Sequence, residues 1–199
     1  IERENSRYFN VCYYVDRTGQ VKARYKKIHL WTTEAKYLSP GNEVCIFSTR
    51  FGKVGIGICW DLAFPEFFRA LILNGAQIVV VPSYWTFGDP EHNFAASRKV
   101  MRSFVDSLCI SRSFENEVVL IYCNAAGKLD VGDSHYETLV GHSKVATPIL
   151  GTVKKLNHNN QALCLAEVDL KILNKAENMY RIKNSIAQSS FAKSLKKTR

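Results

Sequence analysis

Apolar residues recur along this chain in two patterns: short runs typical of β-strands, and longer stretches with helical spacing. Residues 9–15 and 20–26 show the first pattern on either side of the turn Asp16-Arg17-Thr18-Gly19, which predicts a β-hairpin. Further strands are predicted at residues 44–47, 54–59, 77–81, 118–123, 139–146, 151–154 and 162–168. The third and fourth of these runs are continuous and apolar, as in strands buried on both faces.

Three stretches have the spacing of helices. The first begins at Pro65, and its apolar residues recur every three or four positions up to Gly75, which stands where a C-terminal cap would. The second covers about residues 94–114, and the third follows Asp169 and runs to about residue 182. Helices interleaved with strands and hairpins predict an α/β fold with a mixed β-sheet flanked by helices.

Length and composition agree with one folded domain. The chain has 199 residues, of which 46% are hydrophobic and 23% charged, and roughly 150 residues make a typical domain. We assign residues 1–183 to this domain and residues 184–199 to a polar, basic C-terminal tail. The 27 Lys and Arg residues outnumber the 18 Asp and Glu residues, and the net charge is +9. Part of this excess lies in residues 193–199, so the basic character belongs partly to the tail.

The same features argue against several classes of protein. Basic residues are not interleaved with aromatic ones and no recognition motif accompanies them, so nucleic-acid binding is not expected. No apolar run approaches the ~18–20 residues of a membrane span, so no membrane partner is expected. The six cysteines are scattered singly, without a C-x-x-C pair. Together with the lack of a secretory leader, this predicts a cytoplasmic protein with reduced thiols.

The segment of residues 54–66 (VGIGICWDLAFPE) carries the clearest chemistry. A buried strand is expected to end in Cys59, turn sharply, and enter a helix at Pro65. Such a turn lifts a side chain out of the sheet, and the backbone N–H groups after it can hold a developing oxyanion. The nearby helix N-terminus also favours a thiolate. Taken alone, however, a cysteine in an apolar strand is more often a core residue than a nucleophile.

Further sequence blocks surround this segment and favour the nucleophile over the core residue as the role of Cys59. In this order along the chain they are Tyr25-Lys26-Lys27-Ile28-His29-Leu30, Tyr37-Leu38-Ser39-Pro40-Gly41, the cysteine segment, Asn124 to Gly127, and Gly141-His142-Ser143. With these blocks the sequence resembles the nitrilase superfamily of carbon–nitrogen hydrolases over residues 2–182. The resemblance implies a nitrilase-like αββα sandwich, in which two sheets pack face to face, and a homo-oligomer.

The resemblance also implies site residues. Cys59 would be the nucleophile that forms an acyl-enzyme, and Lys27 would hold the oxyanion together with the backbone N–H of Trp60. Glu34 would be a supporting carboxylate. A fixed cation beside a thiol agrees with these roles, because the thiolate and the oxyanion both need positive charge nearby. The alternatives are a solvated lysine at the end of a strand for Lys27 and an exposed loop carboxylate for Glu34.

The family's general base is a glutamate well before the lysine block, and we expect neither Glu2 nor Glu4 to replace it. The N-terminal part of the family's domain is therefore expected to be missing from these 199 residues. Either an upstream segment or a second chain completes the site, or this chain alone is inactive.

The residues after the nucleophile resemble the amidase and carbamoyl-amine hydrolase branches. The implied reaction is hydrolysis of a small linear amide or N-carbamoyl amine, with release of ammonia. The alternatives are nitrile hydrolysis by the same triad and a non-catalytic scaffold subunit. No metal and no cofactor are implied, since the five histidines are isolated in the sequence.

Four residues are candidates for binding the substrate: Trp60, Tyr84, Trp85 and Asn124. Tyr84 and Trp85 follow a predicted strand, at the position where the family faces its substrate, and aromatic rings there would form an apolar wall. Tyr84 and Trp85 are equally compatible with residues of an interface. Asn124 is equally compatible with a residue that holds a loop in place.

Overall fold

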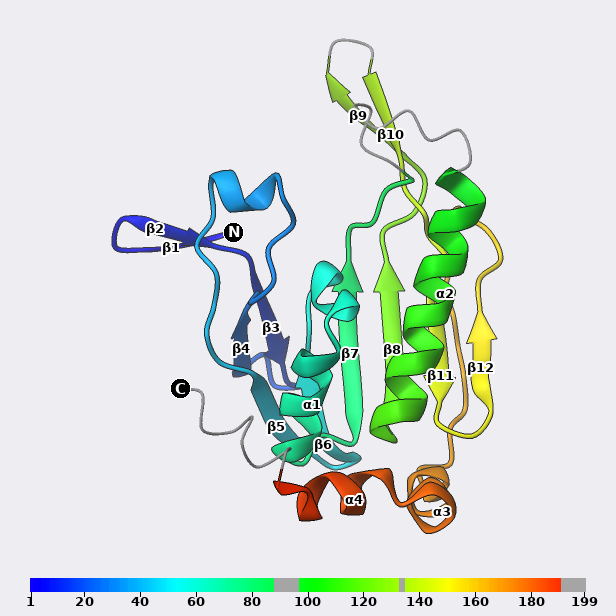
Figure 1. The fold of residues 1–199 in the computed structure, drawn as a ribbon. Coiled ribbons are helices and arrows are strands. Elements are labelled where there is room, and N and C mark those ends of the chain that lie inside the picture. Colours follow the sequence, from blue (N-terminus) through cyan, green and yellow to red (C-terminus); the bar gives the residue numbers. More distant parts are fainter. Residues whose placement is uncertain (88–96, 133–134, 191–199) are drawn as a thin grey trace.

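A computed structural model describes residues 1–87, 97–132 and 135–190 of the chain (Figure 1). Its centre is a six-stranded sheet with the order β12-β11-β8-β7-β6-β5. The three central strands β6, β7 and β8 are parallel, whereas β5, β11 and β12 run antiparallel to their neighbours. The mixed sheet predicted from the sequence is therefore confirmed. Its strands are β5 (Cys45–Thr49), β6 (Gly52–Ile56), β7 (Ile78–Ser83), β8 (Val119–Asn124), β11 (Lys144–Thr147) and β12 (Gly151–Lys155).

Helices flank this sheet. They are α1 (Pro65–Leu73), α2 (Ser97–Asn116), α3 (Lys171–Tyr180) and α4 (Ile182–Gln188), with the short 3₁₀ turns η1 (Glu34–Lys36) and η2 (Cys59–Ala63). Figure 1 shows α1 and α2 against one face of the sheet. Val79 and Leu120 on that face are fully buried in one cluster with Leu71 of α1. On the opposite face, Ile78 packs in a smaller cluster with Leu173 of α3.

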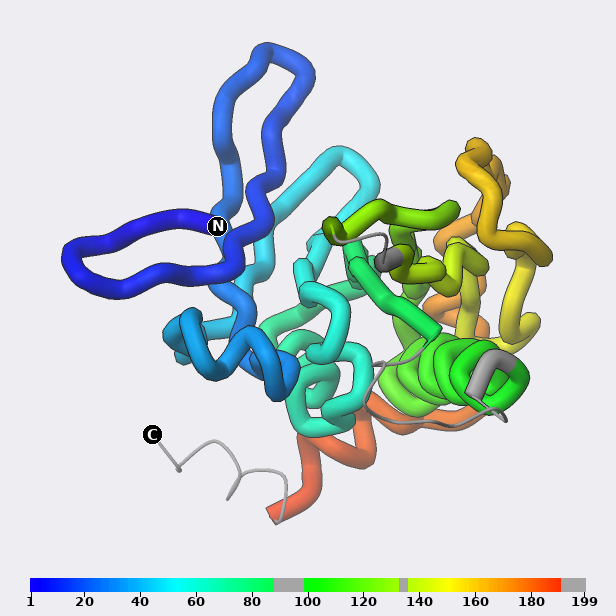
Figure 2. Tube along the Cα trace, turned by 90° about the horizontal axis from the view of Figure 1, so that it is seen from above, coloured from blue at the N-terminus to red at the C-terminus, as the bar shows by residue number. Residues whose placement is uncertain are grey.

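Three hairpins extend this framework. They are β1–β2 (Glu2–Glu4 and Arg7–Phe9), β3–β4 (Val11–Val15 and Val21–Lys26) and β9–β10 (Lys128–Gly132 and His135–Thr138). The β3–β4 hairpin confirms the sequence prediction, whereas the other two were not predicted. Figure 2 shows the two N-terminal hairpins projecting from the body in different directions.

The β1–β2 hairpin is held by charge pairs with β4. Glu2 pairs with Arg24, and Glu4 pairs with both Arg24 and Lys26. Hydrogen bonds from Lys26 and Arg24 lower the pKa of the Glu4 carboxyl. Glu2 and Glu4 thus belong to an ion-pair cluster that holds this hairpin.

Several predicted element boundaries were wrong. β6 ends at Ile56 rather than at residue 59, because the chain turns at Cys59, whose φ of 49° lies in the left-handed region. Of the strand predicted at residues 139–146, only the part from Lys144 is a strand. Gly141 and His142 both have positive φ, at 64° and 56°, and two such residues break the extended conformation.

The strand predicted at residues 162–168 does not form in the structure. The segment is mostly apolar, but Leu163 and Leu165 are 78% and 72% exposed, so the apolar run does not pack against the core as a buried strand would. Only Val168, at the end of the segment, packs against the smaller core cluster. The start of the helix predicted at residue 94 lies outside the described residues, and the described helix α2 ends at Asn116.

The chain remains ordered beyond the predicted domain boundary at residue 183. Helix α4 continues to Gln188, and Ile186 packs against the main core cluster. Residues 184–188, which the sequence analysis assigned to the C-terminal tail, are thus helical, while residues 191–199 lie outside the described part of the chain.

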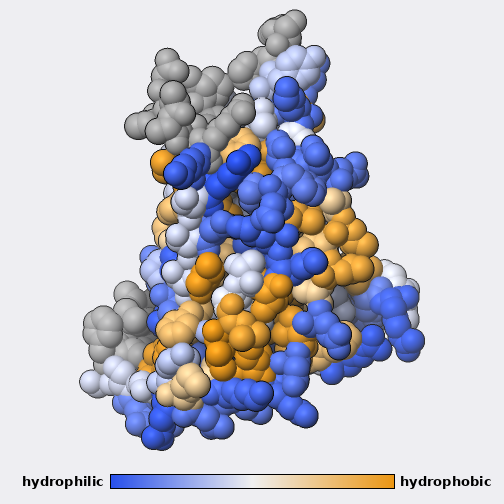
Figure 3. All heavy atoms as spheres, turned by 90° about the vertical axis from the view of Figure 1, so that its right-hand side faces the viewer, coloured by the Kyte–Doolittle hydropathy of each residue, from blue (hydrophilic) through white to orange (hydrophobic). Residues whose placement is uncertain are grey.

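The surface combines polar and apolar areas. Figure 3, seen from the side on which β12 lies, shows apolar side chains gathered on the lower half of this face, below a largely hydrophilic upper part. Leu150, which directly precedes β12, is among the exposed large hydrophobic residues. All six cysteines lie in the described residues and are free thiols. Within the described ranges, no helix has the length and apolar character needed to cross a bilayer.

Candidate active site

A cavity of about 670 Å³ opens where the parallel strands β6 and β7 end. Because the carboxyl ends of neighbouring parallel strands meet at one edge of a sheet, the segments after β6 and β7 both reach this cavity. The predicted site residues that line it are Cys59, Lys27, Glu34, Trp60, Tyr84 and Trp85. They come from sequence blocks that are far apart, and the fold brings them together.

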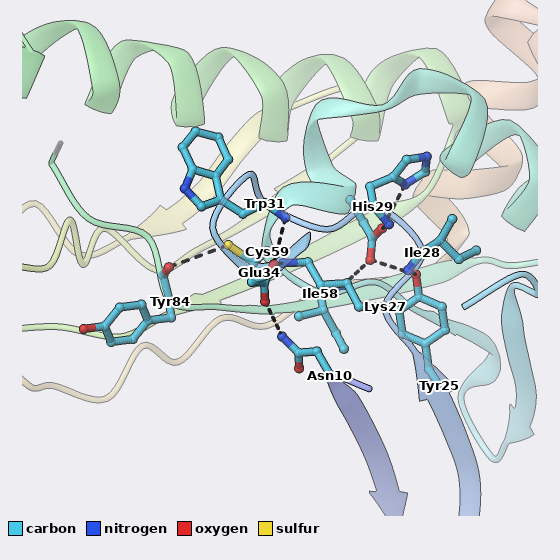
Figure 4. A network of polar contacts seen from close by, with 11 residues as sticks. Asn10, Tyr25, Lys27, Ile28, His29, Trp31, Glu34, Ile58, Cys59 and Tyr84 are labelled. Carbon is cyan, nitrogen blue, oxygen red and sulfur yellow. Dashed lines mark hydrogen bonds and ion pairs between the residues drawn. The ribbon is translucent and has the colours of Figure 1, made fainter. Parts of the chain in front are cut away.

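Cys59 stands at the start of the turn η2, directly after an extended Ile58. The turn is fixed by reciprocal bonds: the Ile58 N–H donates to the Asp61 carboxylate at 2.8 Å, and the Asp61 N–H donates to the Ile58 carbonyl at 3.1 Å. The Cys59 sulfur lies 3.7 Å from the backbone oxygen of Tyr84 (Figure 4). The thiol therefore sits between the ends of β6 and β7, facing the cavity.

The environment of Cys59 contains opposing influences on its thiol. Burial raises the pKa of the Cys59 thiol above its ordinary value, and the nearby carboxylate of Glu34 acts in the same direction. The positive charge of Lys27 and the backbone N–H of Trp60 lower the pKa, but by less. The expected gain in thiolate from the turn after β6 is thus outweighed by desolvation in the free protein.

Lys27 follows β4 and is almost fully buried, with 1% of its side chain exposed. Its ammonium group forms an ion pair with Glu34. This contact excludes the alternative of a solvated lysine at the end of a strand. Since a buried ammonium without a partner is strongly unfavourable, the pair with Glu34 is what allows a positive charge at this depth beside Cys59.

Glu34 is held from three sides. Besides Lys27, the side-chain amide of Asn10 donates to one carboxylate oxygen at 2.7 Å, and the Trp31 N–H donates to the other at 2.8 Å (Figure 4). Burial alone would raise the pKa of Glu34, but the bonds from Lys27, Trp31 and Asn10 lower it on balance. A carboxylate with a lowered pKa is a weak base, so Glu34 is suited to hold Lys27 rather than to accept protons.

Asp61 links the cysteine turn to the lysine block, a role that the sequence did not indicate. Its side chain has no exposed surface. It accepts the Tyr25 hydroxyl at 2.7 Å and the His29 backbone N–H at 2.9 Å, in addition to the Ile58 N–H. These partners lie on both blocks, so a single buried carboxylate fixes Cys59 relative to Lys27.

The proline–glycine turn also has a local physical role. The Gly41 N–H donates to the Lys27 carbonyl at 2.8 Å. A Cβ atom at Gly41 would lie only 2.3 Å from the backbone oxygen of Lys26. Only glycine permits this approach, so the turn at residues 40–41 supports the backbone that carries the buried lysine.

The wall of the cavity is largely aromatic. Trp60 packs edge-on against Trp31, with ring centroids 4.5 Å apart, and lies 5.5 Å from the Trp85 ring. The indole N–H of Trp85 points to the sulfur of Met101 at 3.3 Å, and Met101 also lines the cavity. Trp31 and Met101 were not predicted, because neither stands in a motif and only the fold brings them to the wall.

Tyr84 contacts both the nucleophile and an acidic residue of the cavity lining. While its backbone oxygen contacts the Cys59 sulfur, its hydroxyl donates to the Glu137 carboxylate at 2.7 Å. Partial burial and the bond to Glu137 raise the pKa of Tyr84 to about 12. Glu137 lines the cavity as well, and the sequence analysis did not identify it.

Asn124 is placed differently from the other predicted substrate-binding residues. It does not belong to the lining of this cavity. Its side-chain oxygen accepts the Trp85 N–H at 2.9 Å, and its amide donates to the Gly141 carbonyl at 3.1 Å. Asn124 thus tethers the backbone of Trp85 to the segment before β11, which is the loop-tying alternative.

Within the described residues, no cluster of three or more His, Cys, Asp or Glu side chains is arranged to hold a metal ion. The histidine nearest the site, His29, stacks on Phe64 with ring centroids 3.7 Å apart, and its ring nitrogen lies 2.9 Å from Asp61. It has a packing and positioning role.

Comparison with known proteins agrees with this geometry. The profile of the carbon–nitrogen hydrolase family matches residues 1–177, which is most of the chain. The chain belongs to the carbon–nitrogen hydrolase family. Among similar sequences, "Probable nitrilase C965.09" of Schizosaccharomyces pombe is 33% identical over 169 residues, which cover 85% of this chain and 56% of that protein. N-carbamoylputrescine amidase of Oryza sativa subsp. japonica is 30% identical over 177 residues, covering 85% and 57%.

The fold is shared with solved structures of this family. A carbon–nitrogen hydrolase from Helicobacter pylori G27 superimposes with a TM-score of 0.83 at 22% identity, over 96% of this chain and 65% of that one. An amidase from Nesterenkonia sp. AN1 superimposes with a TM-score of 0.67 at 25% identity, over 87% and 60%. The α/β fold of the nitrilase superfamily is thereby confirmed. The chain spans a little over half the length of the curated relatives it matches.

Proposed function

We propose that this chain contributes the nucleophile, the oxyanion site and the substrate wall for hydrolysis of a small linear amide or N-carbamoyl amine. The convergence of Cys59, Lys27 and Glu34 in one cavity carries the proposal. It joins a thiol, a buried cation and the carboxylate that stabilises the cation, which are the groups that acyl transfer to sulfur requires.

In the proposed reaction, the Cys59 sulfur loses its proton and attacks the carbonyl carbon of the amide. The carbonyl oxygen becomes an oxyanion, which Lys27 and the Trp60 N–H stabilise. Collapse of this intermediate breaks the C–N bond, and the nitrogen leaves as ammonia after taking up the proton that Cys59 released. An amide substrate leaves a thioester on Cys59, and an N-carbamoyl amine leaves a thiocarbamate. Water then hydrolyses this acyl-enzyme and restores the thiol, and activation of that water is assigned to a carboxylate outside the residues identified in this cavity.

The relatives support both the bond and the nucleophile. Similar sequences include N-carbamoylputrescine amidases and a 2-oxoglutaramate amidase of Bacillus subtilis, the latter 30% identical. For the Nesterenkonia amidase, at 25% identity, the solved structure contains the acetamide moiety of fluoroacetamide bound covalently at the active-site cysteine. By analogy, we assign the same attachment point in this chain to Cys59.

The test separates acylation from turnover. The protein is incubated with fluoroacetamide, and peptide mass spectrometry locates the added acetamide moiety. We expect it on Cys59, with no addition in Cys59→Ser and unchanged addition in Cys164→Ser, since Cys164 lies outside the cavity. Ammonia release from a set of linear amides and N-carbamoyl amines is measured in parallel. Addition spread over several cysteines, or ammonia release that survives Cys59→Ser, would refute the assignment.

A further inference from the structure

We propose that Glu137, oriented by Tyr84, is a specificity-determining residue that selects substrates with a positive charge at the end remote from the scissile bond. This inference rests on the proposed function and names the substrate class for the same cavity. Its basis is the distribution of charge among the lining residues.

Two of the charged residues that line the cavity neutralise each other, and for a third the described residues contain no partner of opposite charge. Among the described residues, the charged lining groups are Lys27, Glu34 and Glu137. The first two form an ion pair with each other, so the part of the cavity beside Cys59 carries no net charge from them. Glu137 makes no ion pair within the described part of the chain, and its partner there is the neutral Tyr84 hydroxyl. The uncompensated charge of the cavity is therefore negative and lies at Glu137.

Glu137 is fixed in position rather than free to turn away. It lies in β10 opposite Leu129 of β9. The next residue, Thr138, accepts the Phe87 N–H through its carbonyl at 3.1 Å, and the following one forms a bridge with Thr86. Both contacts tie this strand to the segment that follows β7, where Tyr84 lies. The Tyr84 hydroxyl remains a donor at neutral pH, because its pKa is raised to about 12.

The bond from Tyr84 occupies only part of the capacity of Glu137. An ionised carboxylate has about four acceptor positions on its two oxygens, and Tyr84 donates to one oxygen. The remaining positions suit an ammonium or guanidinium group, for which hydrogen bonds to a carboxylate are stronger than those between neutral partners.

The path between the two ends suits a short alkyl chain. Tyr84 contacts the Cys59 sulfur through its backbone oxygen and Glu137 through its hydroxyl. The length of one tyrosine residue therefore sets the separation between the nucleophile and the Glu137 carboxylate. Trp60, Trp85 and Met101 add apolar surface to the lining. A linear molecule with a carbamoyl or amide group at one end, methylene groups in the middle and a cation at the other end complements this arrangement. A terminal carboxylate would instead meet the charge of Glu137.

The experiment compares three compounds of similar length that differ in their terminal group. These are N-carbamoylputrescine with an ammonium end, N-carbamoylbutylamine with a methyl end, and N-carbamoyl-γ-aminobutyrate with a carboxylate end. Binding to the Cys59→Ser protein is measured by calorimetry, and ammonia release by the unaltered protein gives kcat/KM. We expect the ammonium compound to bind about 10-fold or more tightly than the methyl compound, since each 1.4 kcal/mol is a factor of ten, and the carboxylate compound to bind most weakly.

Glu137→Gln keeps the side-chain size and removes the charge. In this variant we expect the preference for the ammonium compound over the methyl compound to fall to within about threefold. Glu167→Gln is the matched control, because Glu167 is exposed and outside the cavity. It should leave the preference unchanged.

The two proposals fail in different ways. Equal binding of the ammonium and methyl compounds, or a preference that survives Glu137→Gln, would overturn the role of Glu137 while ammonia release still supports the proposed reaction. Selective binding of the ammonium compound without ammonia release from any of the three would support the subsite and count against the reaction.

Discussion

The buried carboxylate of Asp61 gives the most direct test of how this site is held together. Its two oxygens accept from the His29 backbone N–H, the Ile58 backbone N–H and the Tyr25 hydroxyl. The change Asp61→Asn keeps the shape of the side chain but replaces one acceptor oxygen with an NH₂ group. Whichever way the amide turns, this group faces one of the two backbone N–H groups, so one buried donor loses its partner.

The cost follows from these bonds. An unpaired buried donor costs about 1–3 kcal/mol, and hydrogen bonds to a charged group contribute about 1 kcal/mol more than neutral ones. With one donor unpaired and two remaining bonds weakened, Asp61→Asn should lower the free energy of unfolding by about 3–5 kcal/mol. This is a large share of the ~5–15 kcal/mol that stabilises a typical protein. Tyr25→Phe removes the hydroxyl that donates to the Asp61 carboxylate and accepts the Ile28 N–H, and it should cost about 1.5–3 kcal/mol.

Urea unfolding followed by tryptophan fluorescence is the appropriate assay. The chain has 3 tryptophans, and all of them line the cavity. The control is Asp130→Asn, because Asp130 is exposed and accepts a hydrogen bond from the nearby Gly132 N–H at 3.0 Å. It should change the free energy of unfolding by no more than about 0.5 kcal/mol. If Asp61→Asn is as stable as this control, the argument that Asp61 ties the two blocks together is wrong.

Two further predictions concern titration of the site. The pKa of Glu34 is lowered in the folded protein from an ordinary value of 4.5, so its contribution to stability is present above that value and is lost as the pH falls through the folded pKa. The slope of the unfolding free energy against pH in this acid range should therefore be smaller in Glu34→Gln. An unchanged slope would contradict the assignment. Burial raises the pKa of the Cys59 thiol from an ordinary value of 9.0, so the rate of its alkylation by iodoacetamide should still increase as the pH passes 9.0. A rate that reaches a plateau near neutral pH would show a stabilised thiolate instead.

Much of the framework could be predicted because its signals are local. The hairpin at β3–β4, the buried strands β7 and β8, and the helix beginning at Pro65 each carry their pattern within a few residues. The convergence of the blocks around Lys27 and Cys59 was expected from their resemblance to the nitrilase superfamily, and no local signal in the sequence indicates it.

The remainder depends on contacts between distant residues. Asp61 lies 36 residues from Tyr25 and 32 from His29, and no periodicity links such partners. Every residue of β9 is exposed, so that strand has no buried face to produce a clear pattern. Residues 162–168 show the converse case, since an apolar run typical of a strand is present but no strand forms there. Glu137 was not predicted because its contact also joins distant residues: only the tertiary fold brings it to Tyr84.

The electrostatics of the cavity connect its chemistry with its selectivity. In the free protein, burial raises the pKa of Cys59 and favours the protonated thiol, and the neighbouring cation Lys27 is engaged by Glu34. The thiol therefore gains little reactivity from its surroundings before a substrate binds. A substrate that fills the cavity places its carbonyl beside Lys27, and the buried charge acts more strongly on a developing oxyanion there than it would in water. Binding at the far end, through Glu137, then determines which molecules stay long enough to benefit from it.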